Sequence, residues 1–231
     1  MRYLGGKSRI ASKIVGLINS ETPLDSPFYD VFAGGLSITC AAATTRTGPV
    51  YANDRCTPLI TMYQRWSTGW RPKKLGYLDY LQLKRKQDPL DPHTALAGFG
   101  MSFAGIWFGS YARDSVNTSY FDVSVRSLEK GMGPCQDVEF TCKDFSALSP
   151  PSESVVYLDP PYKGTASYRY HQGFSTRRLL SWSANLPTPH VFMSEYESPG
   201  PNWEEVGSFD TQGSGLSRKQ EKLFRLISSP P

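Results

Sequence analysis

The residues best suited to chemistry follow a hydrophobic run in the C-terminal half of the chain. Val155 to Leu158 is apolar with a strand pattern, and Asp159-Pro160-Pro161-Tyr162 comes directly after it. Two consecutive prolines remove two backbone N–H donors and fix φ, so the carbonyl groups of this turn remain available to accept hydrogen bonds from another molecule. Asp159 and the Pro160 carbonyl could therefore both accept from one amino group.

Such a pair of acceptors suits an exocyclic amine of adenine or cytosine. The amine is a poor nucleophile because its lone pair is delocalised into the ring, and two acceptors aimed at its two protons would polarise the nitrogen towards tetrahedral geometry. Tyr162 offers a flat face for a base, and base–aromatic stacking is worth about 1–3 kcal/mol, which would offset part of the cost of extruding a base from a duplex. The alternative interpretation is a strand-terminating turn with an acidic cap.

Two segments nearer the N-terminus have the order of a nucleoside-binding α/β unit. Phe28 to Phe32 predicts a buried strand, Ala33-Gly34-Gly35 a tight turn, and Leu36 to Thr45 a helix. Val50 to Ala52 predicts a second strand that ends at Asn53-Asp54. The acidic residue follows the glycine turn by about 20 positions, which is the spacing of such units.

The N-terminal segment predicts a loop that leads into a helix. Gly5-Gly6 marks a turn, and apolar residues follow at helical spacing between Lys7 and Ser20. The backbone amides of this loop, together with Lys7, are therefore expected at a helix N-terminus.

The middle of the chain differs from both ends. From Cys56 to about Cys135 the pattern favours helices with many aromatic side chains, which we interpret as an inserted, mostly helical module. Strand patterns and one further helix complete the α/β body; the strands are expected at residues 138–141, 155–158, 190–193, 203–209 and 222–227, and the helix at residues 176–185.

Basic side chains are concentrated within this predicted module. Residues 64–86 contain seven lysine or arginine residues and a single acidic one, Asp79. A basic stretch of this kind matches a polyanion, because it attracts phosphates and releases their condensed counterions. A solvated helix face is the equally simple alternative.

Composition limits the remaining classes of function. No apolar run approaches the roughly 18 residues needed to cross a bilayer, and the N-terminus has no hydrophobic signal core, so we expect a soluble, intracellular protein. The four cysteines form no Cys-x-x-Cys pair and the three histidines are scattered. We therefore expect no metal site, no disulfide framework and no membrane partner.

Several of these motifs occur in the order found in one enzyme family. The chain resembles the Dam-like N6-adenine DNA methyltransferases (D12 class, alpha type), from its N-terminus to near residue 226. The motifs that carry the resemblance are Tyr3-Leu4-Gly5-Gly6-Lys7, Asp30-Val31-Phe32-Ala33-Gly34-Gly35, Asn53-Asp54, Asp144-Phe145, Asp159-Pro160-Pro161-Tyr162 and, more weakly, Ser217-Arg218-Lys219-Gln220-Glu221-Lys222-Leu223-Phe224.

The resemblance implies S-adenosylmethionine as the cofactor, and a protein of the bacterial cytoplasm that is encoded by the cell or by a phage. It makes Tyr3 and Lys7 cofactor contacts, although Lys7 alone would more often be a solvated cation. It lets Asp54 accept from the ribose hydroxyls, as acids do in other nucleoside-binding α/β folds, with an ordinary Asn-Asp turn as the alternative. The full set of implied cofactor contacts is Tyr3, Gly6, Lys7, Phe32, Ala33, Gly34, Gly35, Asp54, Asp144, Phe145 and Asp159, and the implied catalytic residues are Asp159, Pro160, Pro161 and Tyr162.

The segment from Phe99 to Arg113 resembles the recognition segment of the same family. The family's asparagine and glycine pattern is replaced here by residues 109–113, which leaves the target sequence open. Arg113 is placed to read a guanine edge, and Phe108 is placed either as a wedge between bases or as a core residue. The expected DNA contacts are Phe108, Tyr111, Arg113, Lys73 and Lys74.

Together these features predict a Rossmann-like α/β methyltransferase fold. Residues 1–55 and 137–231 are expected to form the catalytic body, and residues 56–136 a target-recognition insertion. The expected activity is methylation of adenine N6 in double-stranded DNA by a monomer or weak dimer, through base flipping and direct transfer. Methylation of RNA adenine or of cytosine N4, and a non-catalytic DNA-binding protein on the same fold, remain as alternatives.

Overall fold

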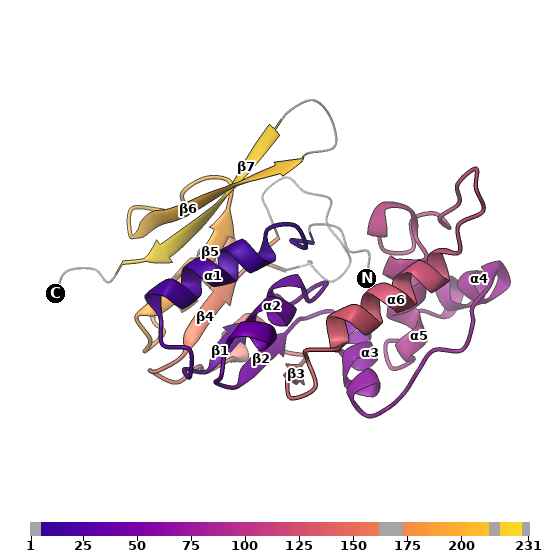
Figure 1. The fold of residues 1–231 in the computed structure, drawn as a ribbon, viewed down its shortest axis with the longest axis horizontal. Coiled ribbons are helices and arrows are strands. Elements are labelled where there is room, and N and C mark those ends of the chain that lie inside the picture. The colour runs from indigo at the N-terminus through magenta and orange to yellow at the C-terminus, as the bar shows by residue number, and fades with distance from the viewer. Residues whose placement is uncertain (1–5, 162–172, 213–217, 228–231) are drawn as a thin grey trace.

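The computed structural model describes residues 6–161, 173–212 and 218–227 (Figure 1). A seven-stranded sheet with the order β3-β2-β1-β4-β5-β7-β6 organises the body. Its strands are β1 (Phe28–Asp30), β2 (Val50–Asn53), β3 (Glu139–Thr141), β4 (Val155–Leu158), β5 (His190–Glu195), β6 (Trp203–Gln212) and β7 (Arg218–Leu226).

Five of these strands are parallel, and the last two form an antiparallel hairpin at one edge. Strand β1 pairs in parallel with β2 and β4, β2 with β3, and β4 with β5. Strand β7 then pairs antiparallel with both β5 and β6. Parallel strands end at a common edge, so the segments that follow β1, β2 and β4 meet there.

Helices cover both faces of the sheet, because the strands bury side chains on both sides. The helices of the body are α1 (Ala11–Glu21), α2 (Ser37–Thr45) and α7 (Thr176–Ala184), with a short 3₁₀ turn η3 (Phe145–Ala147). Alternate residues of a strand point to opposite faces. Tyr157 accordingly joins the core beneath α1 and α2, and Leu158 joins a second core with Leu179 of α7.

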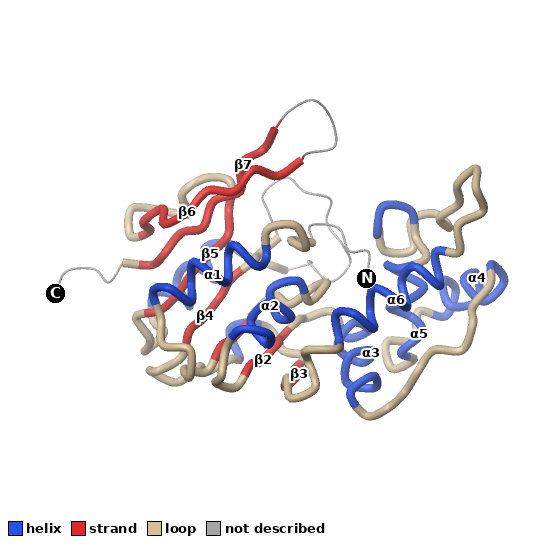
Figure 2. Tube along the Cα trace, in the orientation of Figure 1, coloured by secondary structure: helices blue, strands red, loops and turns tan. Residues whose placement is uncertain are grey.

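The middle of the chain forms a helical module beside the sheet, next to β2 and β3 (Figures 1 and 2). Between β2 and β3 the chain contains helices and connections and no strand of the sheet. The elements are α3 (Thr57–Ser67), α4 (Tyr77–Lys86), α5 (Pro92–Ala95), a π-helical turn η1 (Leu96–Gly100), a 3₁₀ turn η2 (Phe103–Gly105) and α6 (Tyr120–Met132).

The module shares its hydrophobic core with the body. Leu59 and Tyr63 of α3 belong to the same buried cluster as Phe140 of β3 and Ile14 of α1, and the Tyr63 and Phe140 rings lie 5.5 Å apart. The module is therefore packed onto the body through α3.

The fold class expected from sequence, a mixed α/β body with a helical insertion, is confirmed. The predicted elements also occur close to their expected bounds. The first helix starts later than expected, at Ala11, because the Lys7 carbonyl accepts from the amides of Ile10 and Ala11 in a preceding turn. Within the described residues, no helix is long and apolar enough to cross a membrane.

Candidate active site

The candidate site lies at the carboxyl ends of β1, β2 and β4. Backbone hydrogen bonds continue past these strands and hold their ends together. The Val31 amide donates to the Tyr157 carbonyl at 3.1 Å, and the Ala33 amide donates to the Asn53 carbonyl at 2.8 Å. The glycine turn, the Asn53-Asp54 segment and Asp159 are thus brought to one edge, although more than 100 positions separate the first from the last.

Asp54 fixes the glycine turn. Its Oδ2 accepts from the Gly34 amide at 2.9 Å, while its Oδ1 accepts from the Cys56 amide at 2.8 Å. The Tyr63 hydroxyl donates to the Gly34 carbonyl at 2.7 Å, and Gly34 has the positive φ of 43° that favours glycine. Burial raises the pKa of Asp54, and the two backbone hydrogen bonds oppose that rise.

Asn53 is a structural residue of the site that the sequence interpretation did not single out. Its buried side chain donates to the carbonyls of Val31 and Lys143, both at 3.1 Å. Its Oδ1 accepts from the Thr141 hydroxyl and the Lys143 amide, both at 3.0 Å. One amide group therefore joins the ends of three strands. Its position directly before Asp54 in the Asn53-Asp54 motif was the sequence feature that could have identified it as a site residue.

Lys7 is buried in an ion-pair cluster. Its side-chain Nζ lies 2.8 Å from Asp159 Oδ1 and also contacts Glu221 Oε1 on β7. The residue is 4% exposed, so the alternative of a solvated cation is wrong. Glu221 was absent from the predicted site, because no sequence pattern predicts that the last strand, β7, brings this residue to Lys7 in the N-terminal loop.

Asp159 remains accessible at the end of β4. Its side chain is 20% exposed, whereas that of Lys7 is 2% exposed. Pro160, which follows it, is buried, and Pro161 is half-buried. Tyr162, the fourth residue of the motif, and Tyr3 lie outside the described residues.

Asp30, the last residue of β1, is a buried carboxylate beneath the site. Its Oδ2 accepts from the Thr39 hydroxyl of α2 at 2.6 Å, while its Oδ1 has no hydrogen-bond partner among the described residues. Burial raises the pKa of Asp30 to about 7; the hydrogen bond from Thr39 opposes this rise, and the charges of Asp159 and Asp54 add to it.

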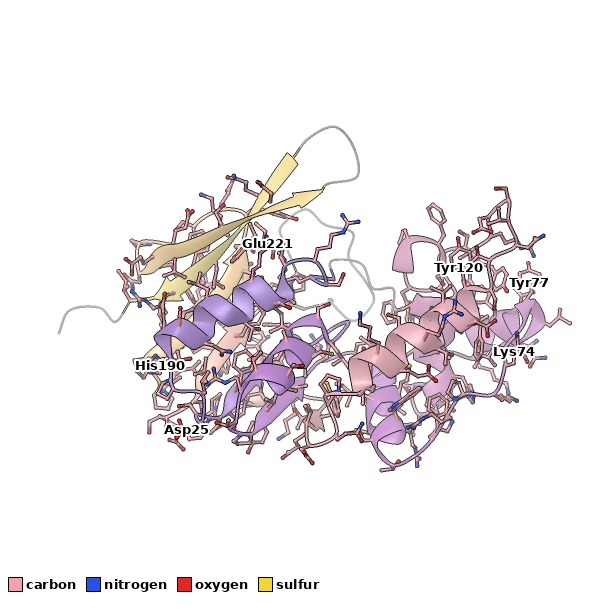
Figure 3. The ribbon with its side chains drawn as sticks, viewed as in Figure 1. Asp25, Lys74, Tyr77, Tyr120, His190 and Glu221 are labelled. Atoms are coloured by element: carbon pink, nitrogen blue, oxygen red, sulfur yellow. The ribbon has the colours of Figure 1, made fainter. Side chains whose placement is uncertain are left out.

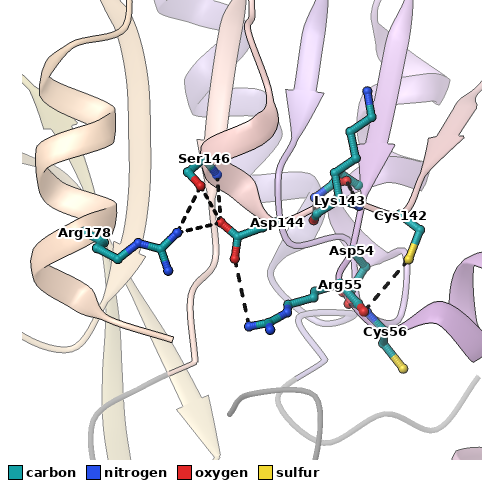
Figure 4. Close-up of polar contacts among 9 residues, drawn as sticks. Asp54, Arg55, Cys56, Cys142, Lys143, Asp144, Ser146 and Arg178 are labelled. Carbon is teal, nitrogen blue, oxygen red and sulfur yellow. Dashed lines mark hydrogen bonds and ion pairs between the residues drawn. The ribbon is translucent and has the colours of Figure 1, made fainter. Parts of the chain in front are cut away.

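Asp144 is held between two arginines (Figure 4). Arg178 of α7 donates to Asp144 Oδ1 at 3.0 Å, and Arg55 lies 3.9 Å from Oδ2. Ser146 donates to Oδ1 through its amide and its hydroxyl, at 3.1 and 2.7 Å. Burial alone would raise the pKa of Asp144, but the hydrogen bonds from Ser146 and the charges of Arg178 and Arg55 outweigh it and lower the pKa. The carboxylate therefore stays ionised and also caps the η3 turn.

Aromatic rings line the region beside Asp144. Phe145 is buried, and the centre of its ring lies 6.0 Å from that of Phe32 and 6.2 Å from that of Phe174. Phe32 is half-buried, and its ring meets Phe174 edge-on at 6.0 Å. The structure thus brings the predicted residues Phe32 and Phe145 together. Gly6, in the loop before α1, is exposed.

Phe108, expected from sequence as either a wedge or a core residue, is a core residue. It is 5% exposed, and its ring packs against Tyr80 at 5.6 Å and Trp107 at 4.8 Å. A wedge must reach outward to insert between bases, so this burial corrects the wedge interpretation. The exposed apolar side chains of the same segment are Phe103, 61% exposed, and Ile106, 40% exposed.

The other predicted DNA contacts lie on the surface of the module. Arg113 is exposed, and its guanidinium lies 4.7 Å from the centre of the Tyr77 ring and 5.5 Å from that of Tyr111. Lys73 is exposed, and Lys74 forms an exposed ion pair with Asp122 at 3.2 Å. Figure 3 shows Lys74 and Tyr77 at the end of the module that is remote from the sheet.

The sheet order, with the candidate site at the carboxyl edge of the parallel strands, defines a Rossmann-like α/β fold. Residues 3–81 match the model of the D12 class N6 adenine-specific DNA methyltransferase family. The resemblance inferred from the motifs is thereby confirmed over that part of the chain, and the match supports methyl transfer as the class of reaction.

Three solved methyltransferase structures align with this chain at low identity and with TM-scores below 0.5. An RNA methyltransferase from Salinibacter ruber, solved in complex with S-adenosyl-L-homocysteine, is 13% identical with a TM-score of 0.49, over 99% of this chain and 97% of that one. The 23S rRNA methyltransferase ErmE is 13% identical with a TM-score of 0.46, over 99% and 71%. A precorrin-6y C5,15-methyltransferase from Geobacter metallireducens GS-15 is 10% identical with a TM-score of 0.44, over 94% and 87%.

Proposed function

We propose that this protein transfers a methyl group from S-adenosylmethionine to the N6 amine of adenine in double-stranded DNA. The observation that carries the proposal is the position of Asp159, partly exposed at the end of β4 and joined through Lys7 to the N-terminal loop. That loop and the glycine turn lie within the part of the chain that matches the D12 class family.

The charges at the carboxyl edge fit this cofactor. S-adenosylmethionine carries an ammonium and a sulfonium group, and buried carboxylates stabilise cations. The unpartnered Oδ1 of Asp30 is a buried acceptor at this edge. Asp54 and the turn at residues 32–35 would hold the ribose and the methionine portion, while Phe145 would pack near the adenine ring. When bound, S-adenosylmethionine supplies an electrophilic methyl group on sulfur.

Asp144 is proposed to accept a hydrogen bond from the amino group of the cofactor's adenine. Its Oδ1 already accepts from Arg178 and Ser146. A carboxylate accepts up to about four hydrogen bonds, so Oδ2, with Arg55 at 3.9 Å, offers the remaining capacity. Asp144 therefore binds the adenine amine through Oδ2 in this proposal.

The protein's own contribution to the reaction is to hold and polarise the target amine. Asp159 and the Pro160 carbonyl accept hydrogen bonds from its two N–H groups, which directs the nitrogen lone pair towards the methyl group. Holding the two reactants in such a geometry gains roughly 7–11 kcal/mol in well-oriented systems. Tyr162 is proposed to stack on the flipped base.

The helical module is proposed as the part that binds DNA. Lys73, Lys74 and Tyr111 would contact the backbone, and Arg113 would read a guanine edge in the major groove. Because Phe108 is buried, the exposed Phe103 and Ile106 take its place as candidate apolar contacts with the bases.

Transfer of labelled methyl groups tests the proposal. Purified protein is incubated with S-adenosylmethionine labelled in its methyl group and with duplex DNA, single-stranded DNA or RNA, and the nucleosides are then separated. We expect N6-methyladenosine from duplex DNA. Label in N4-methylcytosine or in RNA would instead favour the other amine acceptors. DNA binding without cofactor binding would favour a non-catalytic protein.

The Asp159→Ala variant tests the polarising role of this carboxylate. Its loss of the polarising carboxylate should reduce methyl transfer at least 100-fold, as the removal of one well-placed electrostatic group often does. Asp210→Ala, a change on the exposed β6 strand, is the matched control and should leave the rate unchanged. Wild-type rates in Asp159→Ala would contradict the proposed mechanism.

A further inference from the structure

The cluster of Lys7, Asp159 and Glu221 joins three distant parts of the chain. Lys7 lies in the loop before α1, Asp159 at the end of β4, and Glu221 on the antiparallel strand β7. Figure 3 labels Glu221 on the body, well away from the labelled residues of the module. The site is therefore completed by the C-terminal hairpin as well as by the parallel strands.

Burial fixes the positions of the charged groups in this cluster. Lys7 is 4% exposed and Glu221 is 5% exposed, so neither charge can move into water without a structural change. Burial alone would lower the pKa of Lys7, but the charges of Asp159 and Glu221 outweigh it and raise the pKa above its usual value. Lys7 thus remains an ammonium group between two carboxylates.

The two carboxylates differ in their freedom. Asp159 follows the end of β4 and has a partly exposed side chain, whereas Glu221 is buried on β7, where it pairs with Phe209 of β6. A lysine has a flexible four-carbon stem, so a hydrogen bond to Asp159 alone would orient that carboxylate poorly. A second bond to a carboxylate on a paired strand fixes the ammonium group.

We propose that Glu221 is a positioning residue for methyl transfer, which acts by anchoring Lys7 so that Lys7 orients the Asp159 carboxylate towards the target amine. This inference rests on the proposed function. Lys7 donates to Oδ1 of Asp159, whose side chain is 20% exposed. The target amine can therefore approach this carboxylate while Lys7 holds it.

Two substitutions of Glu221 test this role. Glu221→Gln removes the charge, and Glu221→Asp keeps the charge but withdraws it by one methylene group. Glu205→Gln is the matched control, because Glu205 lies on the neighbouring strand β6 with a partly exposed side chain, 2.7 Å from Lys222. Rates of methyl transfer, KM for DNA and for S-adenosylmethionine, and melting temperatures are measured for all of them.

The expected result is a loss in kcat without a comparable change in binding. Glu221→Gln should lower kcat about 10- to 100-fold, the range that a misplacement of about 1 Å can cause, with both KM values within about 3-fold of wild type. Glu221→Asp should recover part of that loss, and Glu205→Gln should match the wild type. Melting temperatures identify any variant whose loss comes from unfolding.

A double-mutant cycle with Lys7→Met shows whether Glu221 acts through Lys7. If it does, Glu221→Gln should lower kcat by less than about 3-fold in a Lys7→Met protein, because the ammonium group that Glu221 anchors is already absent. An equal loss in both backgrounds, a wild-type kcat in Glu221→Gln, or a raised KM with unchanged kcat would each overturn the inference. Absence of transfer by the wild-type protein and the control would instead refute the proposed function, and the inference with it.

Discussion

At the scale of single residues, Asp30 is a buried carboxylate beneath the site whose charge is only partly compensated. It ends β1 below the glycine turn, fully surrounded by protein, with one oxygen bonded to Thr39 and the other without a partner among the described residues. A buried carboxylate without full compensation prefers its neutral form. The native protein therefore binds a proton at Asp30 more tightly than the unfolded chain does.

This proton affinity predicts a specific dependence of stability on pH. The pKa of Asp30 is about 7 in the folded protein and near 3.8 in the unfolded chain, so its contribution to the free energy of unfolding falls as pH rises between these values. Between about pH 5 and pH 8 the loss is roughly 2–3 kcal/mol for wild type, and Asp30→Asn should lack it. Urea unfolding without cofactor, at several pH values, measures both proteins; parallel curves would contradict the prediction.

At the scale of elements, the module depends on close packing around the η1 turn. The carbonyl of Gly98 accepts from the Phe108 amide at 2.8 Å, and the rings of Trp107 and Phe108 lie against the Gly98 backbone. A Cβ atom at position 98 would lie 2.5 Å from Trp107 Cζ3 and 3.0 Å from Phe108 Cε2. Glycine is therefore required here by its neighbours and not by its φ.

Gly98→Ala should destabilise the protein, whereas a glycine-to-alanine change at an exposed helical position should stabilise it. Overpacking of a filled core costs typically about 1–3 kcal/mol. Gly16 lies on the exposed side of α1, with nothing within 4 Å of an added Cβ, and Gly16→Ala should gain about 0.5–1 kcal/mol because alanine restricts the unfolded chain. Thermal and urea unfolding of the two variants should therefore shift in opposite directions.

At the scale of the whole molecule, charge separates the module from the body. The exposed basic side chains of residues 64–86 lie on the module, where Lys73, Arg85 and Lys86 form no ion pair with the described residues. The acidic residues at the carboxyl edge belong to the body. A polyanion is thus attracted to one part of the molecule, and a cationic cofactor to the other.

Loss of a phosphate-contacting lysine should weaken DNA binding equally for all sequences. Lys73→Ala is expected to reduce the slope of log K against log salt by about 1, with little change in the preference between sites. Lys13→Ala, which removes an exposed lysine from α1 on the body, is the control. Binding titrations at several salt concentrations measure the slopes, and identical slopes for Lys73→Ala and wild type would exclude Lys73 as a contact.

The sequence by itself determined the elements of the body and the motifs at their ends. Strand patterns at residues 28–32, 50–52 and 155–158 correspond to β1, β2 and β4, because local alternation and turn residues report secondary structure directly. Since parallel strands share a carboxyl edge, the same patterns placed Asp54, Asp159 and the glycine turn in one site.

Only the tertiary structure decided which side chains meet across the fold. The contact of Lys7 with Glu221 depends on where β7 lies in the sheet, and that placement follows from packing over the whole core. Burial of Phe108 and exposure of Phe103 likewise depend on how α4 and η1 pack, since both are phenylalanines in one apolar run. A sequence pattern states which residues suit a core or a site, but long-range packing selects among them.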